Sequence, residues 1–167
     1  MIKYTVETLD ECLEDMKPLL EKHYDEIAMY RDKIEFDPDY DMYYNLEAIG
    51  SLHMVTVRDD GNLVGYYVSF IHHNLHYKQN KFSVNDILFV HPDYRGSSVA
   101  YRMLKFVEAE LRKIGCTVMT LHMKTDFPFE PLCEAVGMEK EEYTYTKYIG
   151  DKHGHISRSG FRCYNRR

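Results

Sequence analysis

The stretch Val-His-Pro-Asp-Tyr-Arg-Gly-Ser-Ser-Val-Ala occupies residues 90–100 and joins a predicted strand to a predicted helix. At its centre lie the small residues Gly96, Ser97 and Ser98. They allow an anion to approach the backbone N–H groups at the start of the helix, where the helix dipole also favours negative charge. This composition is typical of a pyrophosphate site, but a plain strand–helix turn with a serine cap has it too.

Before this stretch, four segments alternate between apolar and polar residues with the period of a strand: residues 2–7, 52–58, 63–74 and 82–90. The sequence Asp-Asp-Gly-Asn at 59–62 is a hairpin signal, so the last three segments are predicted to form an antiparallel meander. A helical region follows the first strand, with Thr8 or Asp10 as its cap. Pro18 is expected to break or kink it, and a second helix is predicted from Asp41 to Ala48.

After this stretch, Val99, Met103, Val107 and Leu111 recur every fourth residue and predict a helix over 98–115. The remaining chain predicts a strand, a short helix and a final strand, over residues 116–123, 127–136 and 141–149. The expected fold is α/β: a mixed, mostly antiparallel sheet of about six to seven strands flanked by helices. We expect one domain over 1–150 and a basic tail over 151–167.

Charge is unevenly distributed along the 167 residues. The net charge is −6, yet residues 1–60 carry 16 Asp and Glu against 6 Lys and Arg. Such a distribution suits a protein that meets a cationic amine on one side and an anionic cofactor on the other, although solvated surfaces give the same pattern. The four cysteines are widely spaced, and neither a signal peptide nor a membrane span is evident, so a cytoplasmic protein is expected.

Residues 90–100 also resemble the acetyl-CoA signature of the GNAT acetyltransferases. Arg95, Gly96, Ser97, Val99 and Ala100 fit this signature in register, and the run from Val90 to Gly96 fits the strand end that precedes it. Ser98 departs from the pattern, since the family has its central glycine there, and its Cβ could weaken CoA binding. The resemblance covers residues 55–150 well, and the chain also resembles acetyltransferases of tailed bacteriophages.

The resemblance implies a GNAT-like fold and a reaction in which a primary amine of a small molecule or peptide attacks the thioester of acetyl-CoA directly. It places the pantetheine against the backbone of Leu88, Phe89 and Val90, and the pyrophosphate against the segment from Arg95 to Ala100. Asp86 aligns with the glutamate that serves as the base in many members. A strand-end aspartate that only bonds a loop is the alternative interpretation.

The general acid is less clearly placed by the resemblance. The family's tyrosine corresponds here to Cys133, whose thiol could protonate the departing CoA; a core cysteine with another donor is the alternative, and Tyr143 and Tyr145 are nearby candidates. The family's asparagine near the start of the same helix is Asp126 in this sequence.

The histidine-rich stretch at 72–77 is not predicted to bind a metal, because no carboxylate or cysteine lies close to it in sequence. His76 and Tyr77 are candidates for a catalytic and a substrate-binding role at the tip between two strands, and a solvated loop is the alternative.

Three further interpretations stay open at this point. The basic tail motivates acyl transfer to a nucleic acid or an aminoacyl-tRNA, although only two aromatic residues in it could stack on bases. The departures at Ser98, Cys133 and Asp126 motivate a binding module that has lost catalysis. A homodimer is the default expectation, because relatives are often dimers.

Overall fold

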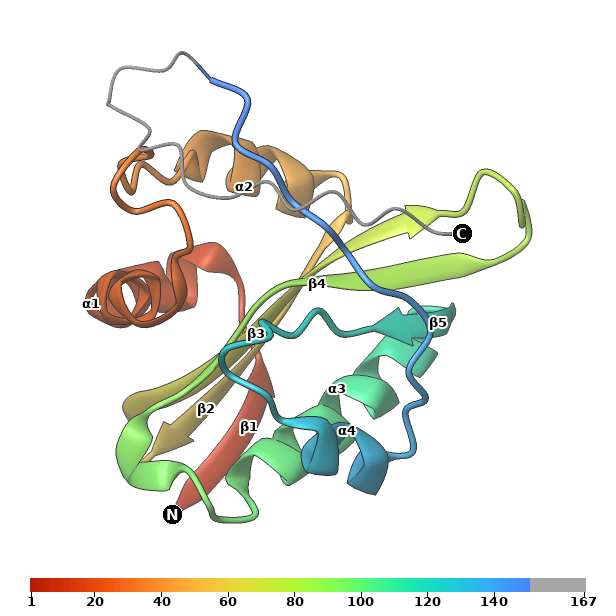
Figure 1. Cartoon of the computed structure of the whole chain (residues 1–167). Coiled ribbons are helices and arrows are strands. Elements are labelled where there is room, and N and C mark those ends of the chain that lie inside the picture. The colour runs from red at the N-terminus through yellow and green to blue at the C-terminus, as the bar shows by residue number, and fades with distance from the viewer. Residues whose placement is uncertain (151–167) are drawn as a thin grey trace.

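The computed structural model describes residues 1–150, and these form a five-stranded sheet with helices on both faces (Figure 1). The strands lie in chain order: β1 (Ile2–Val6), β2 (Leu52–Asp59), β3 (Asn62–His73), β4 (Lys81–Val90) and β5 (Cys116–Thr120). The first four pair antiparallel, and β5 pairs parallel to β4. The expected mixed α/β sheet is confirmed, whereas the expected six to seven strands are not.

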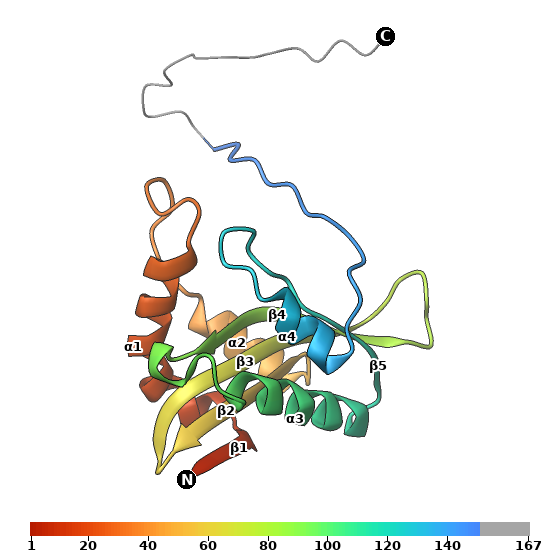
Figure 2. The same ribbon diagram turned by 60° about the horizontal axis from the view of Figure 1, so that its bottom comes forward.

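Two apolar cores hold the helices on the sheet, and Figure 2 shows the layers from a second direction. The helices α1 (Leu9–Ile27) and α2 (Tyr40–Ala48) cover one face. The helices α3 (Val99–Lys113) and α4 (Glu130–Val136) cover the other, after a 3₁₀ turn at Pro92–Tyr94. Every buried residue of α3 lies on one stripe, as its sequence pattern predicts.

Helix α1 runs without interruption through Pro18, so the predicted break is wrong, while the alternative of a kink stays a prediction. Thr8 caps its first turn, and the Glu11 carboxylate accepts from the Thr8 backbone N–H at 2.8 Å and from its hydroxyl at 2.9 Å. Proline removes one N–H donor from the helix, but Leu13, Met16 and Leu19 beside it are buried against the sheet. Packing of this apolar face outweighs the local preference of one residue.

The segment 141–149 forms no strand, which accounts for the lower strand count. Alternation favours an extended backbone, but a strand also needs a partner edge. This segment instead contacts the loop after α1: the Thr146 and Tyr30 hydroxyl groups lie 3.3 Å apart, and the Tyr148 and Tyr30 rings 6.0 Å apart. Tyr145 is 93% exposed.

Two other boundaries differ from the prediction by three residues. Strand β5 ends at Thr120 instead of residue 123, and α4 begins at Glu130 instead of residue 127. Gly137 ends α4 with a φ of 88°, a conformation suited to glycine, as the sequence indicates. The basic tail expected over 151–167 lies outside the described residues.

Gly65 allows β3 and β4 to approach closely at the centre of the sheet. A Cβ at this position would lie 2.9 Å from the Phe89 carbonyl oxygen, which is backbone and cannot rotate away. We expect Gly65→Ala to lower the free energy of unfolding by about 1–3 kcal/mol, the usual cost of overpacking. Urea unfolding measures this effect, with Asn62→Ala at the exposed start of β3 as the control. Equal midpoints for Gly65→Ala and the wild type would contradict the prediction.

Candidate active site

Asp86 lies at an irregularity of β4. Val68 of β3 pairs with Ile87, but the next residue, Ser69, pairs with Asn85, so Asp86 is an extra residue on β4. Such a β-bulge leaves the extra residue unpaired and re-aims its side chain. The Asp86 carboxylate accepts a hydrogen bond from the Tyr43 hydroxyl of α2, so the side chain faces the layer that contains α1 and α2.

Burial sets the electrostatics of this pair. Removal of Asp86 from solvent raises the pKa of its carboxyl, and the Tyr43 hydrogen bond opposes this shift. Burial and the neighbouring carboxylate raise the pKa of Tyr43, which therefore remains a donor at neutral pH. A half-buried carboxylate with a raised pKa is better suited to accept a proton near neutral pH than an exposed one.

The edge of β4 next to Asp86 faces no strand in the described residues. The parallel pairing with β5 covers only Lys81 to Val84, and beyond it the Asn85 side-chain oxygen accepts from the His122 backbone N–H. Residues 87–90 pair with β3 alone. Every second residue of an antiparallel pair turns its backbone groups to the partner strand, and the His91 N–H donates to Val64 of β3, so those of Phe89 also face β3. Leu88 and Val90 turn their backbone groups to the open edge, where the Val90 carbonyl oxygen already accepts from Arg95.

The turn before α3 presents backbone donors. In residues 1–150, the N–H groups of Gly96, Ser97, Ser98 and Ala100 donate to no protein group, and the Val99 N–H lies 3.3 Å from the Ser97 hydroxyl oxygen. Gly96 has a φ of 72°, and a Cβ there would meet nothing within 4 Å.

Ser98 is the N-cap of α3 and has an ordinary φ of −76°. Its serine side chain therefore adds no backbone strain in place of the family's glycine. Unpaired donors at the start of a 15-residue helix fit a pyrophosphate.

The Arg95 side chain is already occupied by protein groups. Its guanidinium donates to both carboxylate oxygens of Glu26, at 2.6 and 2.8 Å, and to the Val90 carbonyl oxygen at 2.8 Å. This bidentate ion pair joins the end of α1 to the turn before α3. The Arg95 backbone N–H also donates to a protein group, the Pro92 carbonyl oxygen at 3.1 Å. Arg95 therefore fixes the position of the turn, and its predicted direct contact with a cofactor stays a prediction.

If this turn binds acetyl-CoA, as the resemblance implies, Glu26→Gln is expected to weaken that binding about two- to fivefold, because the turn loses its bidentate ion pair. A roughly two- to fivefold change in affinity is the effect expected from an ion pair that, like Arg95 and Glu26, is partly exposed to solvent. Calorimetric titration with acetyl-CoA measures it, and Glu110→Gln, which removes the pair with Lys113 on the α3 surface, is the matched control. Equal affinity in both variants would contradict a positioning role for Glu26.

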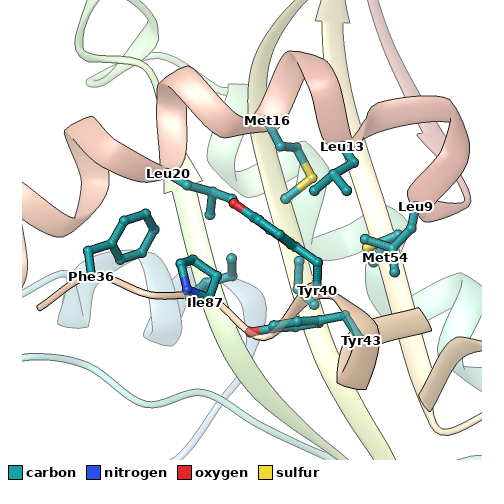
Figure 3. A pocket seen from close by; sticks show the side chains of 11 residues that line it. Leu9, Leu13, Met16, Leu20, Phe36, Tyr40, Tyr43, Met54 and Ile87 are labelled. Atoms are coloured by element: carbon teal, nitrogen blue, oxygen red, sulfur yellow. The ribbon is translucent and has the colours of Figure 1, made fainter. Parts of the chain in front are cut away.

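An apolar pocket of about 90 Å³ lies between α1, α2 and the sheet (Figure 3). Leu13 and Met16 line it from α1, and Met54 and Val68 line it from the sheet. Tyr43 also lines it and connects the pocket to Asp86 through its hydroxyl.

His76 and Tyr77 lie at the tip of the loop between β3 and β4, where both side chains are exposed. Their backbone N–H groups donate to the Asn74 side-chain oxygen, at 2.8 and 3.1 Å. Five residues of β4 separate Asp86 from the base of this loop at Lys81, about 16 Å along the strand. The described structure therefore does not bring His76 or Tyr77 together with Asp86, and their functional roles stay predictions.

Cys133 lies on α4, on the opposite side of the sheet from Tyr43, and is half-buried. Burial raises the pKa of its thiol, which keeps the proton at neutral pH. Its role as the acid stays a prediction. No group of His, Cys, Asp and Glu side chains within residues 1–150 could hold a metal ion.

Tyr43 is the residue of this site that the sequence analysis does not identify. Within the described chain it alone donates a side-chain hydrogen bond to the Asp86 carboxylate, from 43 positions away. The tyrosines of α2 at positions 40, 43 and 44 share one helical face, and that spacing was the available signal. No helix in the described residues is long and apolar enough to cross a membrane.

Strand β4 thus carries a half-buried carboxylate and an open edge, and unpaired N–H groups lie at the start of the helix that follows it. The model of the Acetyltransferase (GNAT) family matches residues 13–135. The chain belongs to this family, which confirms the resemblance seen in the sequence.

Three solved structures illustrate the shared fold. Glucosamine-6-phosphate N-acetyltransferase from Arabidopsis thaliana is 14% identical, with a TM-score of 0.69 over 90% of this chain and 99% of the other. Ribosomal-protein-alanine N-acetyltransferase from Brucella melitensis biovar Abortus 2308 is 18% identical, with a TM-score of 0.66 over 90% and 100%. A predicted acetyltransferase with acetyl-CoA from Clostridium acetobutylicum is 15% identical, with a TM-score of 0.66 over 88% and 96%. At these identities the likeness shows the fold, and no curated protein matches the sequence.

Proposed function

We propose that this protein is an acetyl-CoA-dependent N-acetyltransferase that transfers the acetyl group to a primary amine of a small molecule or peptide. The observation that carries the proposal is the bulge of β4, which turns Asp86 toward α2 beside the open edge of the same strand. Membership of the GNAT family and neighbours that act on amines support it.

The chain's own residues would divide the work between binding and proton transfer. The N–H groups of the turn from Gly96 to Ala100 bind the pyrophosphate, and the free edge of residues 86–90 takes the amide-bearing arm. Acetyl-CoA, when bound, supplies an activated thioester. Asp86 accepts the proton of the attacking amine, either directly or through a water molecule, and Tyr43 holds the carboxylate in place.

Holding the amine and the thioester in position is expected to supply much of the rate of acetyl transfer. Two reactants held beside each other on a rigid strand react as if at high local concentration. Strand β4 lies inside the sheet, paired on both sides through Val84, and it contains both Asp86 and the edge proposed for the cofactor.

Calorimetric titration with acetyl-CoA, followed by thiol release with a panel of amines, tests this function. Binding at micromolar concentration with thiol release on an amine class is the expected result. Binding without release on any amine would favour a binding module, and no binding would mean that Ser98 disables the cofactor site.

A further inference from the structure

The apolar pocket beside Asp86 has no part in cofactor binding or proton transfer as described above. Its lining from α1 and the sheet is aliphatic, with Leu13, Met16, Met54 and Val68 among its residues. Leu13, Met54 and Val68 are themselves buried. Each of these side chains has hydrocarbon neighbours, yet together they leave a hollow of about 90 Å³, while protein interiors rarely leave voids larger than a water molecule.

One end of the pocket is joined to the catalytic carboxylate. Tyr43 lines the pocket with its ring and donates its hydroxyl hydrogen to Asp86. Ile87, the residue after Asp86 on β4, lines the pocket as well. A ligand that fills the hollow would therefore meet Tyr43 and, through it, Asp86 at one end, and Tyr40 is the other lining residue with a hydroxyl group.

The mouth of the pocket carries negative charge. In the sequence from Glu35 to Asp41, the residues at 36, 38 and 40 line the pocket (Figure 3), and those at 35, 37, 39 and 41 are acidic and exposed. Within residues 1–150, no salt bridge reaches Glu35, Asp37 or Asp41. Lys17, whose Nζ lies 5.6 Å from the centre of the Tyr40 ring, offsets part of this charge. The four carboxylates of this acidic rim outnumber it and attract cations, whereas the apolar interior rejects a buried ammonium group.

We propose that this pocket binds a short hydrocarbon group of the acceptor, so that the substrates are primary amines with an apolar alkyl substituent next to the reacting nitrogen. The inference rests on the proposed function and specifies its substrate class. The acidic rim draws in the protonated amine, the alkyl group enters between α1 and the sheet, and the nitrogen lies at Asp86. A hollow of about 150 Å³ with a similar lining takes benzene, so this smaller one suits roughly four carbons.

Methionine methyl groups report on the pocket without any turnover. Met16 and Met54 line it, and Met103 is a buried residue of α3 on the other face of the sheet. In protein labelled with ¹³C at the methionine methyl groups, n-butylamine should shift the Met16 and Met54 signals and leave Met103 unchanged. The matched probe 2-methoxyethylamine has an ether oxygen in place of one methylene group and should cause smaller shifts.

Acetyl transfer to the same two amines forms the second arm. We expect kcat/KM for n-butylamine to exceed that for 2-methoxyethylamine at least about fourfold, the value of one buried methylene group. The ether lowers the basicity of the amine and so leaves more of it unprotonated. A preference for n-butylamine therefore cannot come from ionisation.

A variant that fills the pocket tests its location. Leu20 is half-buried and lines the hollow, so Leu20→Phe should lower kcat/KM for n-butylamine while sparing methylamine, which is too short to enter. Ile114→Phe, at the end of α3 on the other face, is the control for an added ring. Circular dichroism and the melting temperature verify that both variants fold.

The outcomes of these experiments distinguish the pocket assignment from the proposed acetyltransferase function. Selective Met16 and Met54 shifts without transfer to any amine would remove the proposed function and keep the pocket as a site for alkylamines. Equal shifts with both probes, or no shifts, would overturn the pocket assignment. Transfer to polar amines that matches transfer to n-butylamine would also overturn it, while the acetyltransferase function would stand.

Discussion

Asp86→Asn is expected to lower kcat/KM for amine acetylation about 10²–10⁴-fold, the range that a positioned general base contributes. Asparagine has nearly the same shape, and its oxygen can still accept from Tyr43, but it cannot take up the proton of the attacking amine. Thiol release at saturating acetyl-CoA measures the effect. Unchanged turnover in this variant would remove Asp86 from the base role.

The pH profile separates a base from a residue that only supports the fold. Burial raises the pKa of Asp86, and the base works as the carboxylate, so activity should fall as the pH falls through this raised pKa. In Tyr43→Phe the hydrogen bond that holds the pKa down is lost, and the acidic limb of kcat/KM should move to higher pH. A limb that stays in place would mean that another group titrates.

The sequence predicts those parts of the fold that depend on local pattern. The helix over 99–113 follows from its four-residue repeat, and the meander of β2, β3 and β4 follows from alternation with turn residues between. Two predictions are wrong because each relied on a local signal alone. Pro18 favours a break in the helix, but the packing of α1 on the sheet overrides it. Alternation in the segment 141–149 favours a strand, but this segment pairs with no strand in the described residues.

The candidate site also contains parts that local sequence predicts and parts that depend on tertiary packing. The turn at Gly96 can be recognised because a positive φ and small residues are local requirements of an anion-binding helix start. The bulge that turns Asp86 toward α2 depends on a one-residue offset between two strands, which residue types alone do not encode. Tyr43 reaches Asp86 only through the packing of α2 on the sheet, so neither the pair nor the pocket beside it could be predicted from spacing.

His23 should make the protein lose about 3 kcal/mol of stability between neutral pH and pH 4. This side chain of α1 is 7% exposed, its Nδ1 lies 3.1 Å from the Tyr66 hydroxyl, and its ring centre lies 5.2 Å from that of Phe89. Burial lowers the pKa of His23 to about 4 from 6.5, while Glu26 nearby opposes this change and Arg95 adds to it.

The sign follows from proton binding in the two states. Below pH 6.5 the unfolded chain binds a proton at His23 that the folded chain does not, so the free energy of unfolding falls as the pH is lowered and levels off near the folded pKa of about 4. The size follows because a difference of one pH unit between the folded and unfolded pKa values is worth about 1.4 kcal/mol.

Urea unfolding at pH 7 and pH 4 measures this, with His23→Gln as the partner variant because its amide can still bond the Tyr66 hydroxyl and does not titrate. Carboxylates and His53, whose pKa burial also lowers, titrate in both proteins, so the difference between them isolates His23. If the wild type and His23→Gln lost equal stability on acidification, His23 would have to be protonated in the folded state, and its burial between α1 and the sheet would not persist in solution.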